Sequence, residues 1–161
     1  GVVDDLEASG YPAQRKCWAQ ARYTELILRY QLWQTLHDWK KELGHRVDLA
    51  VGHWDETVRD PSMDDAMASE LAQGVWYGWA MVKGKGRNQY GDCAKLCERL
   101  IPAWERTMPN TVGPLVFKGS VYAQYAWEVP GLNSGTMTDE ARKEMHERLE
   151  VARAALEKPS P

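Results

Sequence analysis

The stretch AQRKCWAQARYTELILRYQLWQTLHDWKKEL, residues 13–43, has neither proline nor glycine along its whole length. Pro12 precedes it and suits the first turn of a helix. Large apolar side chains recur in its second half and beyond it at spacings of three, four and seven, namely Trp33, Leu36, Leu43, Val47, Val51, Trp54 and Val58. The pattern predicts one long helix from Ala13 to Leu43, which either continues to about Asp60 or bends at Gly44.

The remainder of the chain repeats the helical pattern in shorter segments. Asp60-Pro61-Ser62 ends the first segment, and the apolar positions 67, 71, 75 and 82 then form one stripe. A helix opens at Gly91-Asp92 and contains Pro102, which is expected to kink it. Residues 109–114 read as a connector, 120–129 as a short helix, and Thr138 as the cap of a helix over 139–157.

No stretch sustains the alternation typical of a strand, and no internal repeat is evident. With 161 residues the chain suits one domain with one core. We therefore predict an all-α fold, a single compact bundle of five or six helices over residues 1–161, with flexible ends at 1–11 and 158–161.

The net charge and the composition limit the classes of function that the chain could have. The net charge of −3 supplies no basic field for nucleic acid. The apolar run Gly74–Val82 is far shorter than the roughly 20 residues of a membrane-spanning helix, so no membrane association is expected. Three cysteines suggest no disulfide framework, which favours a cytoplasmic location, although a leader cleaved before Gly1 would leave no trace.

Eight tryptophans stand against a single phenylalanine. Trp fills cores and anchors interfaces, and the sequence does not separate these roles. The densest group is Trp76, Tyr77 and Trp79, interleaved with Gly74 and Gly78. In the structural interpretation, the glycines allow tight packing between helices. In the functional interpretation, they form the floor of a groove with aromatic walls, and this groove binds a partner.

A second candidate is a metal site. On a continuous helix Asp38, Glu42, His45, His53 and Glu56 fall within a stripe roughly 80° wide. Carboxylates and imidazoles are common metal ligands, but His45 and His53 lie about 12 Å apart along such a helix. The alternative is an ordinary solvated face. Cys93 and Cys97, one turn apart, are read as buried core thiols rather than zinc ligands.

A third candidate is the basic loop with Lys83, Lys85 and Arg87, which could hold a phosphate or a nucleic-acid backbone. It lacks the spacing of a phosphate-cradling loop, and a plain solvated turn is the alternative. The chain also lacks a Gly-x-Ser-x-Gly elbow and a His-Glu-x-x-His helix.

These observations favour a non-enzymatic interaction protein, an assembly, adaptor or inhibitory subunit that binds a protein partner through Trp and Tyr side chains. A homo-oligomer is compatible with the same residues. No cofactor is predicted. Two alternatives stay open: a helical metal-dependent hydrolase that uses a divalent ion on the Asp38 to Glu56 stripe, and a carrier of a small apolar ligand.

Overall fold

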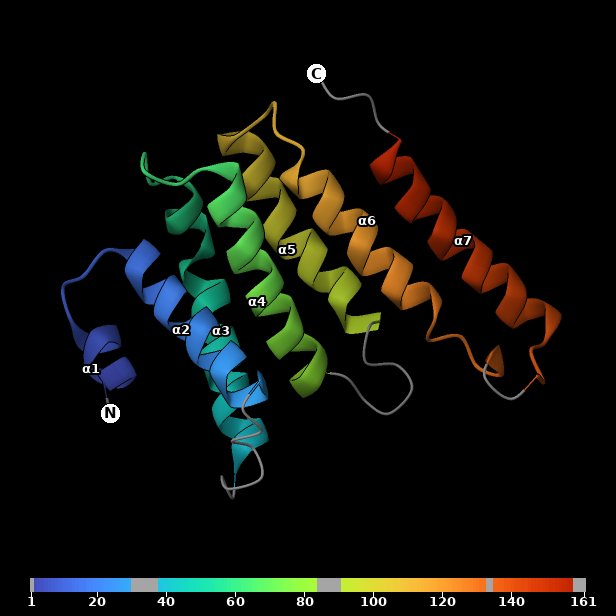
Figure 1. Ribbon diagram of the computed structural model, residues 1–161, viewed down its shortest axis with the longest axis horizontal. Helices are drawn as coiled ribbons and strands as arrows, with labels where there is room; N and C mark the ends of the chain where they lie inside the picture. The colour runs from blue at the N-terminus through green and yellow to red at the C-terminus, as the bar shows by residue number, and fades with distance from the viewer. Residues whose placement is uncertain (1, 30–37, 84–90, 133–134, 158–161) are drawn as a thin grey trace.

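The computed structural model describes residues 2–29, 38–83, 91–132 and 135–157, and these ranges contain seven helices and no strand (Figure 1). In chain order the helices are α1 Val2–Ala8, α2 Ala13–Arg29, α3 Trp39–Val58, α4 Asp65–Lys83, α5 Gly91–Thr107, α6 Gly113–Ala126 and α7 Asp139–Leu156. The predicted all-α fold is confirmed. The helix count is one above the predicted upper value, and α1 lies in a stretch where the sequence pattern indicates no helix.

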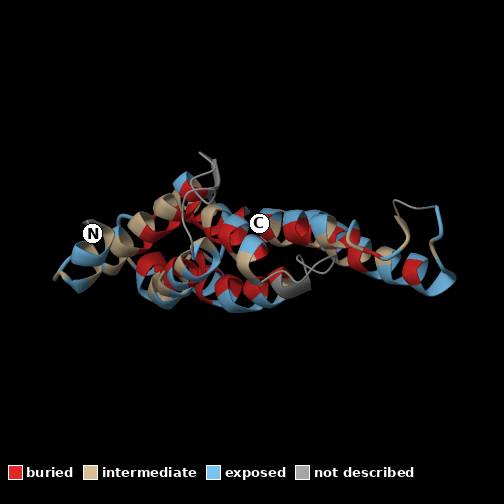
Figure 2. Ribbon diagram, turned by 90° about the horizontal axis from the view of Figure 1, so that it is seen from below, coloured by how far each residue is buried: buried red, intermediate tan, exposed pale blue. Residues whose placement is uncertain are grey.

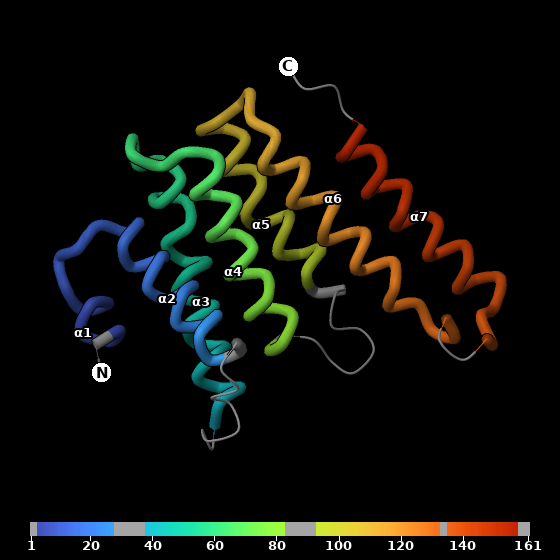
Figure 3. Tube along the Cα trace, in the orientation of Figure 1, coloured from blue at the N-terminus to red at the C-terminus, as the bar shows by residue number. Residues whose placement is uncertain are grey.

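From α2 onward, successive helices run in opposite directions (Figure 3). In Figure 1, α2, α4 and α6 lie side by side in a front layer that α7 extends beyond α6, and α3 and α5 lie behind it. The helices of the two layers pack on one another, α2 on α3, and α4 and α6 on α5, whereas α7 packs almost entirely on α6. The end formed by α6 and α7 is therefore thinner than the rest of the molecule (Figure 2).

The long helix predicted over 13–43 is wrong, because α2, which ends at Arg29, and α3, which begins at Trp39, run in opposite directions (Figure 3). α2 and α3 then lie against one another over much of their length. Packing favours this arrangement, since a single long helix would leave its apolar stripe without a partner. Nor does the chain bend at Gly44, which is buried inside α3, where a Cβ atom would lie 3.1 Å from Cγ1 of Val82.

The predicted start of α7 is confirmed, since the Thr138 hydroxyl accepts a hydrogen bond of 3.2 Å from the Ala141 N–H. α4 begins beyond the predicted stop at Pro61, and the Asp64 carboxylate accepts from the Met67 N–H at 2.8 Å. α6 begins at Gly113, inside the predicted connector and ahead of the predicted 120–129. Pro114 occupies its first turn, a position that proline tolerates well.

The core is aromatic and joins four helices. Trp54 of α3 and Trp104 of α5 are fully buried and meet edge to face, with ring centroids 5.7 Å apart. Phe117 of α6 packs between Trp104 and Trp76 of α4, with centroids 6.4 Å from each. The indoles of Trp54 and Trp104 both have partners, because Trp54 Nε1 donates to the Leu100 carbonyl and Trp104 Nε1 to the Asp65 carboxylate.

In the described ranges no helix has the length and apolar character needed to cross a bilayer.

Two glycines in helices provide a matched test of packing. A Cβ at Gly78 would lie 2.3 Å from Cγ2 of Thr24 and 2.6 Å from Cγ2 of Val47, whereas nothing lies within 4 Å of a Cβ at Gly52. We expect Gly78→Ala to lower the free energy of unfolding by about 1–3 kcal/mol, because β-branched neighbours adjust poorly. Gly52→Ala should raise it by up to about 1 kcal/mol. Urea denaturation measures both, and equal effects would contradict the close approach of α2, α3 and α4.

Candidate functional site

The exposed large apolar side chains lie on some of the helices and not on others. In the part of the chain that the structure describes, α3 and α5 carry none of them. They lie on or next to α2, α4, α6 and α7, and are Tyr11, Leu26, Tyr77, Met81, Val112, Val116, Trp127, Leu149 and Leu156. Trp127, at the C-cap of α6, is the most exposed of them, at 63%.

The hairpin of α6 and α7 gathers most of these residues. Leu156 of α7 packs on Gly119 of α6, where a Cβ would approach its Cγ to 2.6 Å. Further along, Nη1 of Arg148 donates to the Tyr125 carbonyl at 2.9 Å. These two contacts set an antiparallel register between the helices, and thereby decide which of their side chains are neighbours.

At about 100° per residue, this register turns five apolar side chains toward the same side of the hairpin. They are Val116, Trp127, Met145, Leu149 and Leu156, and we call them the apolar stripe. Four of the five are exposed, and Met145 is half-buried. The stripe is therefore a two-helix surface rather than a set of scattered apolar positions.

Charges border the stripe but do not enter it. The helical angle places Arg142 and Arg153 on the outer edge of α7 and Glu144 and Glu147 on the opposite side. Arg142 lies 3.8 Å from Asp139, and Arg153 lies 2.5 Å from Glu150. The outer edge therefore carries both signs of charge.

Arg148 makes the hairpin rigid. Its side chain is almost fully buried and pairs with Glu144 one turn earlier on α7. Its guanidinium also stacks on the ring of Tyr125, 3.5 Å from the centroid, in addition to its bond to the Tyr125 carbonyl. Two of these contacts join α7 to α6, and they hold the two helices in the register that places the apolar stripe on one side.

The residues predicted to bind a partner are separated by the fold. Gly74 approaches Ala21 and Gly78 approaches Thr24, so the expected glycine floor is already covered by α2 of the same chain. Trp76 is 7% exposed and Trp79 is half-buried against the core, whereas Tyr77 is 58% exposed and stacks on Trp76. A partner would meet Tyr77 there, and binding by this set stays a prediction.

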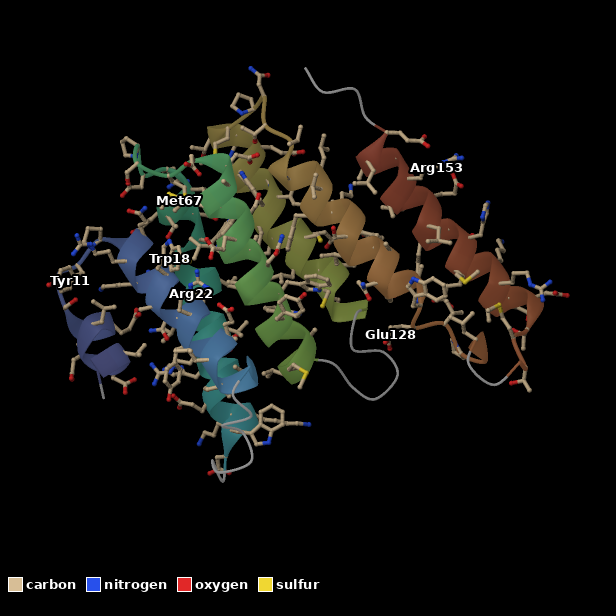
Figure 4. The ribbon with its side chains drawn as sticks, in the orientation of Figure 1. Tyr11, Trp18, Arg22, Met67, Glu128 and Arg153 are labelled. Atoms are coloured by element: carbon tan, nitrogen blue, oxygen red, sulfur yellow. The ribbon has the colours of Figure 1, made fainter. Side chains whose placement is uncertain are left out.

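A shallow cleft lies beside Gly74, where the sequence predicts the partner-binding groove. It is lined by Trp18, Arg22 and Glu25 of α2 and by Glu70 and Leu71 of α4. Figure 4 shows Trp18 and Arg22 on α2, and the Arg22 guanidinium lies over the indole of Trp18, 4.5 Å from the ring. Arg22 also pairs with Glu25 and Glu70, so these charged lining residues already have partners within the chain.

The five residues of the proposed metal stripe do not converge. Glu42 pairs with Arg46 at 2.6 Å, and the imidazole Nε2 of His53 lies 2.5 Å from Glu7 of α1. Asp38, His45 and Glu56 are exposed. Among the residues whose placement is described, no group of three or more His, Cys, Asp or Glu is arranged to hold a metal ion.

The basic loop lies largely outside the described residues, since Lys85 and Arg87 fall in 84–90 and Lys83 is the last residue of α4. The cysteines are described, and all three are buried. Burial raises the pKa of Cys17 and of Cys97 to about 12, so these two stay protonated thiols at neutral pH.

The sequence pattern does not indicate a set of polar contacts that ties α1 to α2 and α3, which we call the clamp. It joins Asp4 and Glu7 of α1 to Gln20, Arg46 and His53. Asp4 lies 2.7 Å from Nη2 of the buried Arg46, and Gln20, fully buried, donates to Glu7 at 2.9 Å. Partial burial acts to raise the pKa of Glu7, but hydrogen bonds from His53 and Gln20 help to hold it below its usual value. The clamp joins residues far apart in sequence, which periodicity does not detect.

Adjacent aromatic side chains on α4 should differ in their effect on stability. Trp76→Ala empties a buried volume and should lower the free energy of unfolding by about 3–5 kcal/mol. Tyr77→Ala should lower it by less than about 1 kcal/mol, because its side chain is largely in solvent. Urea denaturation followed by circular dichroism measures both, and a larger loss for Tyr77→Ala would reverse this assignment.

The clamp predicts that the stability of α1 in the folded chain depends on pH. Since the pKa of Glu7 is lowered in the folded chain, its stabilising effect is present above its ordinary pKa, 4.5, and is lost as pH falls through the folded value. Glu7→Gln should therefore reduce hydrogen-exchange protection of α1 at pH 7, and this reduction should shrink as pH falls below 4.5. Asp5→Asn, at an exposed carboxylate on the same helix, is the control. Equal protection in both variants at pH 7 would contradict the clamp.

No protein-family model, curated protein or solved structure matches this chain. Its function therefore has to be inferred from its own residues and contacts.

Proposed function

We propose that this chain is a non-enzymatic interaction protein that binds a protein partner on its front layer, with Trp127 as the principal anchor. The observation that supports this is that exposed large apolar side chains gather on or next to α6 and α7, whereas α3 and α5 carry none among the described residues. Scattered apolar residues on a surface need no explanation, whereas a contiguous group marks an interaction site.

The chemistry of the apolar stripe suits an interface. Trp is enriched among the residues that dominate binding energies, and its flat ring covers a large area with few rotatable bonds. Leu149 and Leu156 supply aliphatic neighbours, and paired charges border them on the edge of α7. An apolar centre with a polar rim is the usual anatomy of a protein interface.

Rigidity also supports the proposal. Arg148 and the Leu156–Gly119 contact hold α6 and α7 in one register before any partner arrives. A preorganised surface loses less conformational entropy on association than a loop that must first become ordered. The proposal places the principal anchor at Trp127 rather than at Trp76, because α2 packs against Gly74 and Gly78 and Trp76 is buried.

Capture experiments with matched variants test the proposal. The immobilised chain, Trp127→Lys and Leu149→Lys are each exposed to a lysate of the source organism, and bound proteins are quantified. We expect at least one protein whose recovery falls about tenfold or more in both variants, because a charge is placed in an apolar interface.

Gly52→Lys is the control, since it adds the same charge at an exposed position of α3, where nothing lies within 4 Å of a new Cβ atom. Circular dichroism verifies that each variant is folded. If every captured protein binds the wild type, both stripe variants and the control equally, then the apolar stripe is not the binding surface and the proposal fails.

A further inference from the structure

We propose that the apolar stripe associates with the apolar stripe of a second copy of this chain, so that two α6–α7 hairpins pack face to face about a two-fold axis. This inference rests on the proposed function and names the partner. The product is a four-helix bundle built from α6 and α7 of each copy.

The first argument comes from layering. α7 packs almost entirely on α6, and four of the five side chains of the apolar stripe are exposed, so no described helix covers the stripe. Figure 2 shows that the hairpin forms the thinner end of the molecule. Helices with an apolar side are stable when a second layer covers that side. A second hairpin of the same length and register supplies a layer of matching shape.

The second argument comes from charge. In a two-fold interface each patch meets a copy of itself, so a net charge within the patch would face the same charge. The apolar stripe contains no ionisable side chain, and the neighbouring exposed positions on α6 are Ser120 and Gln124. On the edge of α7, Arg142 and Arg153 are each close to a carboxylate. Two copies of this surface can therefore meet without unpaired like charges facing one another.

The third argument comes from size. α7 has 18 residues, a length of about 27 Å, and two adjacent helices are roughly 20 Å wide. The footprint on each copy is therefore on the order of 500 Å², at the lower end of specific protein interfaces. Such an area suits a reversible dimer that forms at roughly micromolar to tens of micromolar concentration rather than a permanent one.

Sedimentation equilibrium of the full chain between about 1 and 500 μM tests the proposal directly, because it measures mass without an added ligand. We expect the average mass to rise with concentration from 18.3 kDa toward twice that value. Trp127→Lys and Leu149→Lys should each raise the chain concentration at which half of the protein is dimeric by at least about tenfold. The reason is that each substitution buries two lysines per dimer. Gly52→Lys should leave this concentration unchanged.

The outcomes separate this inference from the proposed function. A wild type that stays monomeric to 500 μM overturns self-association, whereas the capture experiment still decides whether another protein uses the stripe. A dimer that persists in both stripe variants overturns the assignment of the interface to α6 and α7. Loss of the dimer in the stripe variants, with their helical content retained and the control unaffected, supports the inference.

Discussion

The carboxylate of Asp65 connects three helices, and the position of the exposed surface depends on it. From the start of α4, one of its oxygens accepts from Trp104 Nε1 of α5 at 3.0 Å, and the other accepts from the backbone N–H of Gly113 at 3.0 Å. A Cβ on Gly113 would lie 2.3 Å from this carboxylate and 2.4 Å from the Trp104 ring. Only glycine permits α6 to begin there, and hydrogen bonds to an ionised acceptor are among the stronger ones.

The location of the apolar stripe follows from that starting point. Once α6 begins at Gly113, Phe117 reaches Trp76 and Trp104, and Gly119 faces the opposite way, toward Leu156 of α7. α6 is therefore buried on two sides, by the core and by α7, and its remaining sides stay open. Trp127 at its end emerges on an open side, which is why this Trp is exposed while Trp54 and Trp104 are sealed. The proposed partner surface is thus a geometric consequence of how α6 enters the fold.

The sequence pattern predicted the fold class and several helix ends correctly, because these depend on local chemistry. Thr138 caps α7 by a contact three residues away, and a Pro-containing stop precedes α4. It failed over residues 13–43, where the absence of proline and glycine indicates helix but does not show where the chain reverses. It also did not detect α1, whose clamp uses Gln20, Arg46 and His53 from distant positions.

For the candidate site, the sequence by itself determined that the chain is helical and rich in Trp, and that an interaction protein was the favoured function. Only the tertiary structure decided which Trp is exposed. Trp76 and Trp127 have the same chemistry, but Trp76 faces Phe117 in the core and Trp127 follows the last turn of α6. Likewise, the sequence is compatible with a groove that has Gly74 and Gly78 at its floor, but in the structure α2 packs against both glycines. The physical reason is that helical period reports which residues share a side of one helix, whereas exposure depends on which other helix covers that side.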